Sequence, residues 1–312
     1  MSDADVVVLA GGTGGAKLAH GMQAVLDPAR LTVIANPGDD VEIYGAHVSP
    51  DPDLVCFWLA ERIDERGWGV RGDSFAVMDA LRELGHEVWF NLGDRDLAWC
   101  LERARLLAHG VSPTAALARL ATAIGVRASV LPASDEPVRT WVRTPSGSFS
   151  FQEFMIRQRA AGPVLGLEFR GAEHAQASEA ARSAIARASA IVIGPSNPLA
   201  SIGPILAVRG MREALRAAPA PVVAVSPIVG GQVLKGPTAA FMAYARLSCS
   251  AAGVAEHYGE LLDGIVADED VAHLPTLRID TRMDDAPARA RVAAQTLAFA
   301  ETLRQRGEGA AS

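Results

Sequence analysis

The sequence predicts an α/β fold, with a Rossmann-like parallel sheet, helices on both faces and a small β-rich inserted subdomain. Short apolar, β-branched runs recur along the chain, and each is followed by a stretch with helical periodicity. Hydrophobic residues make up 49% of the 312 residues, which is enough to bury a sheet between two layers of helices. The alternation breaks near the middle of the chain, where extended segments follow one another.

The strand-like runs are joined by helices, so they are expected to form right-handed βαβ units. The expected strands are residues 6–10, 31–36, 87–91, 190–194, 221–225 and 264–268. Helices are expected up to about residue 26, at 53–63, at 74–84, from about residue 95, and at 112–124. Ser112 is the expected N-cap of the last of these, with Pro113 at its first position.

The domain boundaries follow from the interrupted region. Residues 1–126 and 171–312 are assigned to the Rossmann-like core, and residues 127–170 to the small β-rich subdomain. Alternating residues on both sides of Ser146 and Gly147 predict a β-hairpin inside the subdomain.

Composition excludes several classes of partner and indicates the compartment. The net charge of −7 argues against nucleic acid and against an anionic membrane surface. Cys56, Cys100 and Cys249 are far apart, which fits a reducing compartment and no disulfide framework. The acidic start leads directly into a strand, unlike a secretory signal, and no apolar run is long enough to span a bilayer. A cytoplasmic location is expected.

The first strand ends in a glycine-rich loop that predicts a bound phosphate. Backbone N–H groups and a helix N-terminus favour an anion there, and Lys17 adds a positive charge. A dinucleotide fingerprint fails because Lys17 stands in the place of its last glycine, and a Walker A loop fails because Leu18 replaces the hydroxyl residue. The alternative is a tight turn with no ligand. The loop residues are Gly11, Gly12, Thr13, Gly14, Gly15, Ala16 and Lys17.

Acidic residues gather after the second strand. Asn36 is followed by Asp39 and Asp40, and then by Asp51 and Asp53. Carboxylates spaced in this way suit Mg²⁺, which takes one or two of them together with substrate phosphates. The alternatives are a plain turn for the first pair and N-capping of the next helix by one of the second pair.

Three further loops carry polar residues where strands are expected to end, the position at which α/β sheets bind ligands. Gly93, Asp94, Arg95 and Asp96 could contact a polar ring or supply a general base, or they could only cap a helix. The loop after residues 190–194 offers neutral donors and acceptors for a base or a phosphate. Its residues are Gly194, Pro195, Ser196, Asn197 and Ser201. Ser226 and Lys235 follow a later strand, and Lys235 is either a second phosphate contact or a solvated residue.

In their order along the chain, these segments resemble the 2-phospho-L-lactate transferase family, which acts in coenzyme F420 biosynthesis. The resemblance runs from Val6 to beyond Ala255. It rests on GGTGGAK, NPGDD, SPDPD, RGWG (66–69), LGDRD, LPASDEPV (131–138), FQEF, GPSNPLASIGPIL and VSPIVGG. It implies a Rossmann-like fold, often a dimer, and transfer of a phospho-acid from a guanosine-diphosphate-linked donor to the ribityl hydroxyl of the deazaflavin Fo, with release of GMP.

The resemblance also implies roles for the residues named above. The first loop and the loop at 194–201 would hold the guanosine diphosphate part, and Asn36, Gly93, Arg95 and Ser226 would contact substrate. Mg²⁺ would be held among Asp39, Asp40, Asp51 and Asp53, and Asp40, Asp94 and Asp96 are the candidate catalytic residues. The chain departs from the family at Trp99 and Cys100, where a small polar residue and a histidine are expected.

Two other functions remain open from the sequence. A non-enzymatic nucleotide-sugar-binding regulator of the same fold would need the phosphate loop but not the acids of LGDRD. An NAD(P)-dependent dehydrogenase is disfavoured by the failed fingerprint. The donor acid stays undecided among lactate-, enolpyruvate- and glycerate-type groups.

Overall fold

The computed structural model describes residues 5–234 and 236–310, so Lys235 lies outside the described residues. Its centre is a sheet of seven parallel strands in the order β14-β13-β10-β9-β1-β2-β5. In chain order these are β1 Val6–Ala10, β2 Leu31–Ala35, β5 Ser129–Pro132, β9 Ala190–Ile193, β10 Val222–Val225, β13 Gly264–Ala267 and β14 Thr276–Arg278. The predicted parallel α/β sheet is therefore confirmed.

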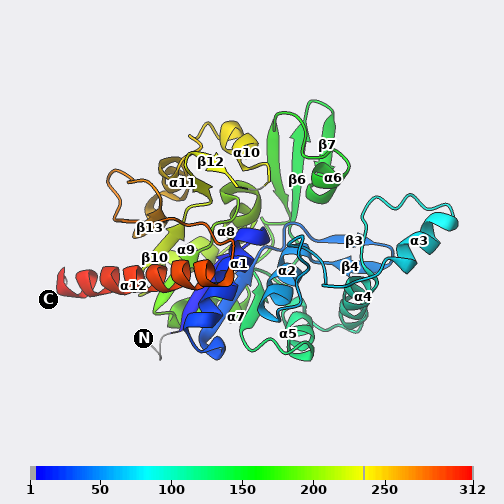
Figure 1. Ribbon diagram of the computed structural model, residues 1–312, viewed down its shortest axis with the longest axis horizontal. Helices are drawn as coiled ribbons and strands as arrows, with labels where there is room; N and C mark the ends of the chain where they lie inside the picture. The colour runs from blue at the N-terminus through cyan, green and yellow to red at the C-terminus, as the bar shows by residue number, and fades with distance from the viewer. Residues whose placement is uncertain (1–4, 235, 311–312) are drawn as a thin grey trace.

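Helices cover both faces of this sheet (Figure 1). The helices are α1 Gly12–Val25, α2 Pro50–Leu59, α3 Ala76–Glu83, α4 Asp94–Ala108, α5 Pro113–Ala123, α6 Phe151–Ile156, α7 Glu179–Arg187, α8 Gly203–Ala207, α9 Met211–Ala217, α10 Thr238–Tyr244, α11 Ala251–Tyr258 and α12 Ala286–Ala310. Among the described residues, no helix is both long enough and apolar enough to cross a bilayer.

The core lies in two halves, one on each face of the sheet. Neighbouring residues of a strand point to opposite faces, so Val6 and Val8 pack with α1, α2 and α12, while Val7 and Leu9 pack with α7, α9 and α11. Every residue of β1 is buried, because both of its faces are covered. Its continuous apolar run is the pattern expected of a central parallel strand.

The order of the strands places a topological switch between β1 and β9. The chain leaves β1 toward β2 and β5 on one side, and β9 begins the other side of the sheet. Ligands bind at the carboxyl ends of strands beside such a switch. The glycine-rich loop after β1 and the loop after β9 lie together there, and the Gly194 N–H donates to the Leu9 carbonyl at 2.9 Å.

A three-stranded antiparallel sheet and α6 form the small β-rich part, seen above the large sheet in Figure 1. Its strands are β6 Arg139–Thr144, β7 Gly147–Ser150 and β8 Gly166–Arg170, and the predicted hairpin joins β6 to β7. Residues 129–132 were expected in the subdomain but form β5 of the large sheet, where they pair with β2 and where Val130 and Leu131 are buried. Two short hairpins complete the strands: β3 Val41–Ile43 with β4 Ala46–Val48, and β11 Ile228–Val229 with β12 Gln232–Val233.

The strand predicted at residues 87–91 is wrong. This segment is not part of any sheet in the described structure, and β5 is the strand that pairs with β2 on this side. Trp89 and Phe90 are half-buried in a long excursion that runs from α2 through α3 to α4. Figure 1 shows α3 at the edge of the molecule, away from the large sheet. An apolar run of five residues cannot by itself distinguish a strand from such a segment.

Glycines allow α1 to approach the loop after β9 very closely. A Cβ on Gly14 would overlap the Pro195 carbonyl, and one on Gly15 would lie 2.8 Å from both the Ala10 Cα and the Ser196 Oγ. Gly12 has a φ of +65°, a conformation that L side chains rarely adopt. These glycines are therefore required by packing, whether or not a phosphate is bound.

Gly14→Ala is expected to lower the free energy of unfolding by about 1–3 kcal/mol, because the added methyl meets backbone that cannot move aside. Gly307→Ala, at an exposed site in α12 with open space around a Cβ, is the matched control. It should leave stability unchanged or raise it by about 0.5–1 kcal/mol. Urea unfolding of both variants measures the difference, and equal stabilities would contradict the packing account.

Candidate functional site

A cavity of about 990 Å³ opens at the carboxyl ends of β1, β9 and β10. Most of the predicted site residues line it: Gly11, Gly12, Thr13, Gly14, Lys17, Asp39, Asp51, Asp53, Gly93, Asp96, Pro195, Ser196, Asn197, Ser201 and Ser226. Among the described residues, Gly15, Asn36, Asp40, Asp94, Arg95 and Gly194 are not part of its wall. Residues far apart in the sequence therefore meet in one place, which is large enough for more than one small molecule.

One end of the cavity has the features of an anion site. The first turn of α1 and Lys17 lie in its wall, so N–H groups and a positive charge face the same space. The Gly11 N–H donates to the Ser196 Oγ at 3.2 Å, which joins the two loops. Asn197 accepts from the N–H groups of Leu199 and Ala200, each at 3.0 Å, and so fixes the loop after β9. This end suits a diphosphate and a nucleoside.

A buried amide holds two of the predicted carboxylates together. The Asn36 Nδ2 donates to Asp39 Oδ1 at 3.0 Å and to Asp51 Oδ2 at 2.8 Å, and the Asn36 Oδ1 accepts from the Gly38 N–H. Asn36 is completely buried, while both carboxylates line the cavity. Asn36 therefore positions this carboxylate pair from behind.

The paired carboxylates are poised between charged and neutral forms. Burial raises the pKa of Asp39 well above its usual range, and the negative charge of Asp51 adds to the effect. Burial also raises the pKa of Asp51 to about 6, although hydrogen bonds from Asn36 and the Gly12 N–H act against it. Two buried carboxylates with hard oxygen atoms at a cavity wall fit a divalent cation, whose charge would offset the cost of their ionisation.

The neighbouring acid, Asp40, points elsewhere. It lines a separate cavity of about 260 Å³ whose other walls come from the β3–β4 hairpin, α4, α5 and residues 132–139. Its Oδ2 lies 3.2 Å from the His47 Nε2 and 4.0 Å from the Arg139 Nη1. The structure therefore brings Asp39, and not Asp40, to the large cavity beside Asp51.

Asp53 is held by other side chains. Both of its oxygens bond to the guanidinium of Arg103, and its Oδ1 also accepts from the Trp99 Nε1 at 2.7 Å. The Ser49 N–H donates to its Oδ2 at 3.4 Å. Ser49 is the N-cap of α2 and Asp53 lies within the first turn, so Asp53 does not have the alternative role of N-cap. Asp53 and Arg103 are both buried, and a cation beside Asp53 would meet a positive charge. The geometry therefore favours Asp39 and Asp51 over Asp53 as metal ligands.

The acids of LGDRD divide into a cap and a cavity residue. Asp94 accepts from the Ser74 hydroxyl at 2.7 Å and from the Ala76 and Val77 N–H groups at 3.1 and 3.0 Å, which fixes the start of α3. These hydrogen bonds lower the pKa of Asp94, and the one from Val77 contributes most. Arg95 is exposed.

Asp73 caps α4 in the same manner. It accepts from the N–H groups of Arg95 and Asp96 at 2.9 and 3.1 Å. Gly93 makes room for it, since a Cβ there would overlap the Asp73 carboxylate. The sequence did not point to Asp73, because its partners lie 22 and 23 residues further along the chain.

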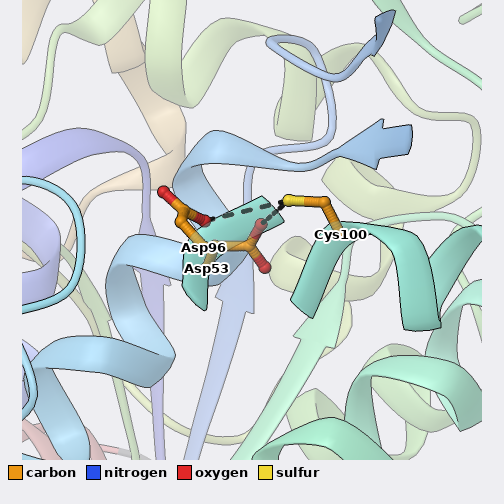
Figure 2. Close-up of side chains that lie close together, drawn as sticks. All are labelled: Asp53, Asp96 and Cys100. Atoms are coloured by element: carbon orange, nitrogen blue, oxygen red, sulfur yellow. Dashed lines mark hydrogen bonds between the residues drawn. The ribbon is translucent and has the colours of Figure 1, made fainter. Parts of the chain in front are cut away.

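Asp96 faces the cavity and has the properties of a general base. Burial raises its pKa to about 7, and the negative charges of Asp53 and Asp73 contribute. Figure 2 shows Asp96 with Asp53 and Cys100, whose potential ligand atoms all lie within 4.8 Å of one another. These three form a possible metal-binding group by distance, but Arg103 already neutralises Asp53.

Part of the cavity wall is apolar and aromatic, and the sequence did not predict that these residues belong to the site. It comprises Phe57, Trp68, Phe75, Trp89, Phe90, Phe151, Met155 and Ile156. The excursion before α4 carries four of these side chains, and α6 carries three, starting from the capping box of Ser150 and Glu153. Such a wall suits a flat ring system. Aromatic residues are only 5% of the chain, so their clustering at 57–90 was an available signal.

Comparison with known proteins shows the family. The family model described as 2-phospho-L-lactate transferase CofD matches residues 6–297. The chain belongs to the CofD family. It is 39% identical over 265 residues to a 2-phospho-L-lactate transferase of Methanosarcina mazei, covering 85% of this chain and 87% of that protein. It is also 38% identical to a phosphoenolpyruvate transferase of Kitasatospora aureofaciens, covering 96% of this chain and 98% of that protein.

A solved structure shares this fold. A member of the UPF0052 family from Bacillus halodurans superposes with a TM-score of 0.63 at 18% identity, covering 95% of this chain and all of that one. At this identity the likeness concerns the fold alone. The assignment of the chain as a transferase rests on the CofD family match and on its curated relatives.

Asp51→Asn is expected to raise the melting temperature of the ligand-free protein at pH 8 by about 2 °C or more. The raised pKa of Asp51 means that ionising it in the folded state costs free energy at pH values above about 6. The gain should shrink as the pH falls from 6 toward 4, because the wild-type carboxyl becomes protonated in the folded state. Melting curves at pH 8 and pH 4.5 measure it, and a gain that grows at low pH would contradict the assignment.

Asp94→Ala is expected to loosen the start of α3. The amide protons of Ala76 and Val77 lose their acceptor, so their hydrogen exchange should accelerate severalfold. Amides in α1 provide the internal control, since they lie on another wall. Unchanged exchange at Ala76 and Val77 would show that Asp94 has another role.

Proposed function

We propose that this CofD-family protein transfers a phospho-acid from a guanosine-diphosphate-linked donor to the ribityl hydroxyl of the deazaflavin Fo and releases GMP, in coenzyme F420 biosynthesis. The observation that supports it is the arrangement of one cavity. An anion end, a buried carboxylate pair and an aromatic wall with a poised carboxylate face the same space. A transfer between a nucleotide donor and an aromatic acceptor needs these parts together.

The donor is proposed to lie along α1 and the loop after β9. N–H groups at the start of α1 and Lys17 would contact the diphosphate, while the polar groups of Ser196, Asn197 and Ser201 would face the nucleoside. Asp39 and Asp51 would hold Mg²⁺ beside the diphosphate. When bound, Mg²⁺ would offset the negative charge of the phosphates and of the carboxylate pair.

The acceptor is proposed to stack against the aromatic wall with its hydroxyl toward Asp96. The hydroxyl oxygen bonds to the phosphorus that carries the acid, and the bond from that phosphorus to the GMP oxygen breaks. Asp96 takes the hydroxyl proton, and GMP leaves with the electron pair. A carboxylate whose pKa is about 7 suits this work, because it accepts a proton at neutral pH and binds it well.

The donor acid is best decided by experiment, since two similar relatives are named for different acids. Purified protein with Mg²⁺ and Fo is incubated separately with the phospholactate, phosphoenolpyruvate and phosphoglycerate donors. GMP release is measured by chromatography, and the deazaflavin product by mass spectrometry. Release of GMP with the matching Fo adduct from at least one donor is expected. If none of the three gives GMP, the proposed reaction is wrong.

Asp96→Asn is expected to lower kcat by about 10²–10⁴-fold, with little change in the KM of the donor, because it removes the proton acceptor only. The rate of the wild type should fall as the pH decreases through about 7, since the base becomes protonated. Asp94→Asn is the matched control on the same helical turn and should stay within about threefold of wild type, because an asparagine can still cap α3. Equal losses in the two variants would contradict the role of Asp96.

A further inference from the structure

Cys100 lies within hydrogen-bonding distance of two carboxylates, those of Asp96 and Asp53 (Figure 2). Its Sγ is 3.8 Å from Asp96 Oδ1 and 4.0 Å from Asp53 Oδ2. Asp96 and Cys100 are four residues apart on α4, so their side chains stand one above the other on the same face. Cys100 is completely buried, whereas Asp96 reaches the cavity.

The thiol can donate one hydrogen bond, and the surrounding contacts decide which of the two carboxylates accepts it. Asp53 already accepts from Arg103, from the Trp99 indole and from the Ser49 N–H. Within the described part of the chain, the Asp96 carboxylate accepts its hydrogen bond from Cys100. We therefore take Asp96 as the acceptor of the Cys100 S–H, because Asp53 already has several other donors.

The charges around Asp96 make this single donor important. Asp53 and Asp73 place negative charge near it, Arg103 places positive charge, and burial removes water. Cys100 itself stays protonated, because burial and the two neighbouring carboxylates raise the pKa of its thiol. It can therefore act as a donor but not as a nucleophile or a redox-active thiolate.

We propose that Cys100 is a positioning residue for Asp96, whose S–H holds that carboxylate toward the cavity and favours its charged, proton-accepting form. The catalytic consequence rests on the proposed function, but the hydrogen bond itself does not. In the Cys100→Ala variant the Asp96 carboxylate loses this donor and should bind its proton more tightly. Cys100→Ser keeps a hydroxyl donor at the same place and should restore much of the effect.

The first test needs no substrate. Protein labelled with ¹³C at the aspartate carboxyl groups is titrated by NMR from pH 5 to pH 9, and the Asp96 signal is identified by its loss in Asp96→Asn. Cys100→Ala should move the midpoint of this signal to higher pH by about 0.5 units, and Cys100→Ser should return it toward wild type. Cys249→Ala, which removes a thiol distant from the cavity, should leave the midpoint unchanged.

The second test uses turnover with the donor that releases GMP. Cys100→Ala should lower kcat about threefold at pH 6.5 and leave it near wild type at pH 9, where Asp96 is charged in both proteins. A purely structural role would lower kcat equally at both pH values. In the Asp96→Asn background the same substitution should add little further loss.

The outcomes separate the two proposals. A titration midpoint that is the same in wild type and Cys100→Ala, with both proteins showing cooperative thermal unfolding, overturns the role of Cys100. Absence of GMP release by the wild type with all three donors overturns the proposed function, and the NMR midpoint still decides the hydrogen bond.

Discussion

The buried ion pair of Asp53 and Arg103 is the contact on which the site depends. It joins α2 to α4, and Arg103 also donates to the His47 carbonyl of the β3–β4 hairpin at 3.1 Å. Removing one member of a buried ion pair costs about 3–5 kcal/mol, because the other charge is left without a partner. The pair is therefore a fixed point between two helices that carry the cavity acids.

Each helix presents one acid from this fixed point. Asp51 lies two residues before Asp53 on α2, and Asp96 lies seven residues before Arg103 on α4. Their surroundings give them different properties. Asp51 and Asp39 accept from the same Asn36 amide, and this pair of carboxylates suits a cation. Asp96 accepts from the Cys100 thiol and remains able to bind a proton. The two roles arise from environment, since the side chains are chemically identical.

Much of the fold could be predicted from the sequence because its strands carry a direct signal. Val6–Ala10 and Val222–Val225 are buried on both faces, so their apolar runs identify them. The same signal misled at residues 87–91, where the apolar side chains face a cavity instead of a neighbouring strand. Local pattern shows that a segment is apolar, and only long-range packing shows what covers it.

The site was predictable as a set of residues but not as a set of roles. Asp94 and Asp96 are separated by about 200° on a helix, so they face opposite sides, and helix geometry alone distinguishes them once the helix start is known. Arg103 lies 50 residues from Asp53 along the chain, and the partners of Asp94 lie 17 to 20 residues from it. No local pattern reveals such contacts, which is why four acids of similar appearance became a cap, an ion pair, a metal-ligand candidate and a base candidate.

The proposed transfer places a divalent cation at Asp39 and Asp51, and not among the acids around Arg103. Anomalous scattering from crystals grown with Mn²⁺ and GDP tests it most directly, because the ion is located without reference to activity. A peak is expected about 2–2.5 Å from carboxylate oxygens of Asp39 and Asp51. A peak among Asp53, Asp96 and Cys100 would contradict it.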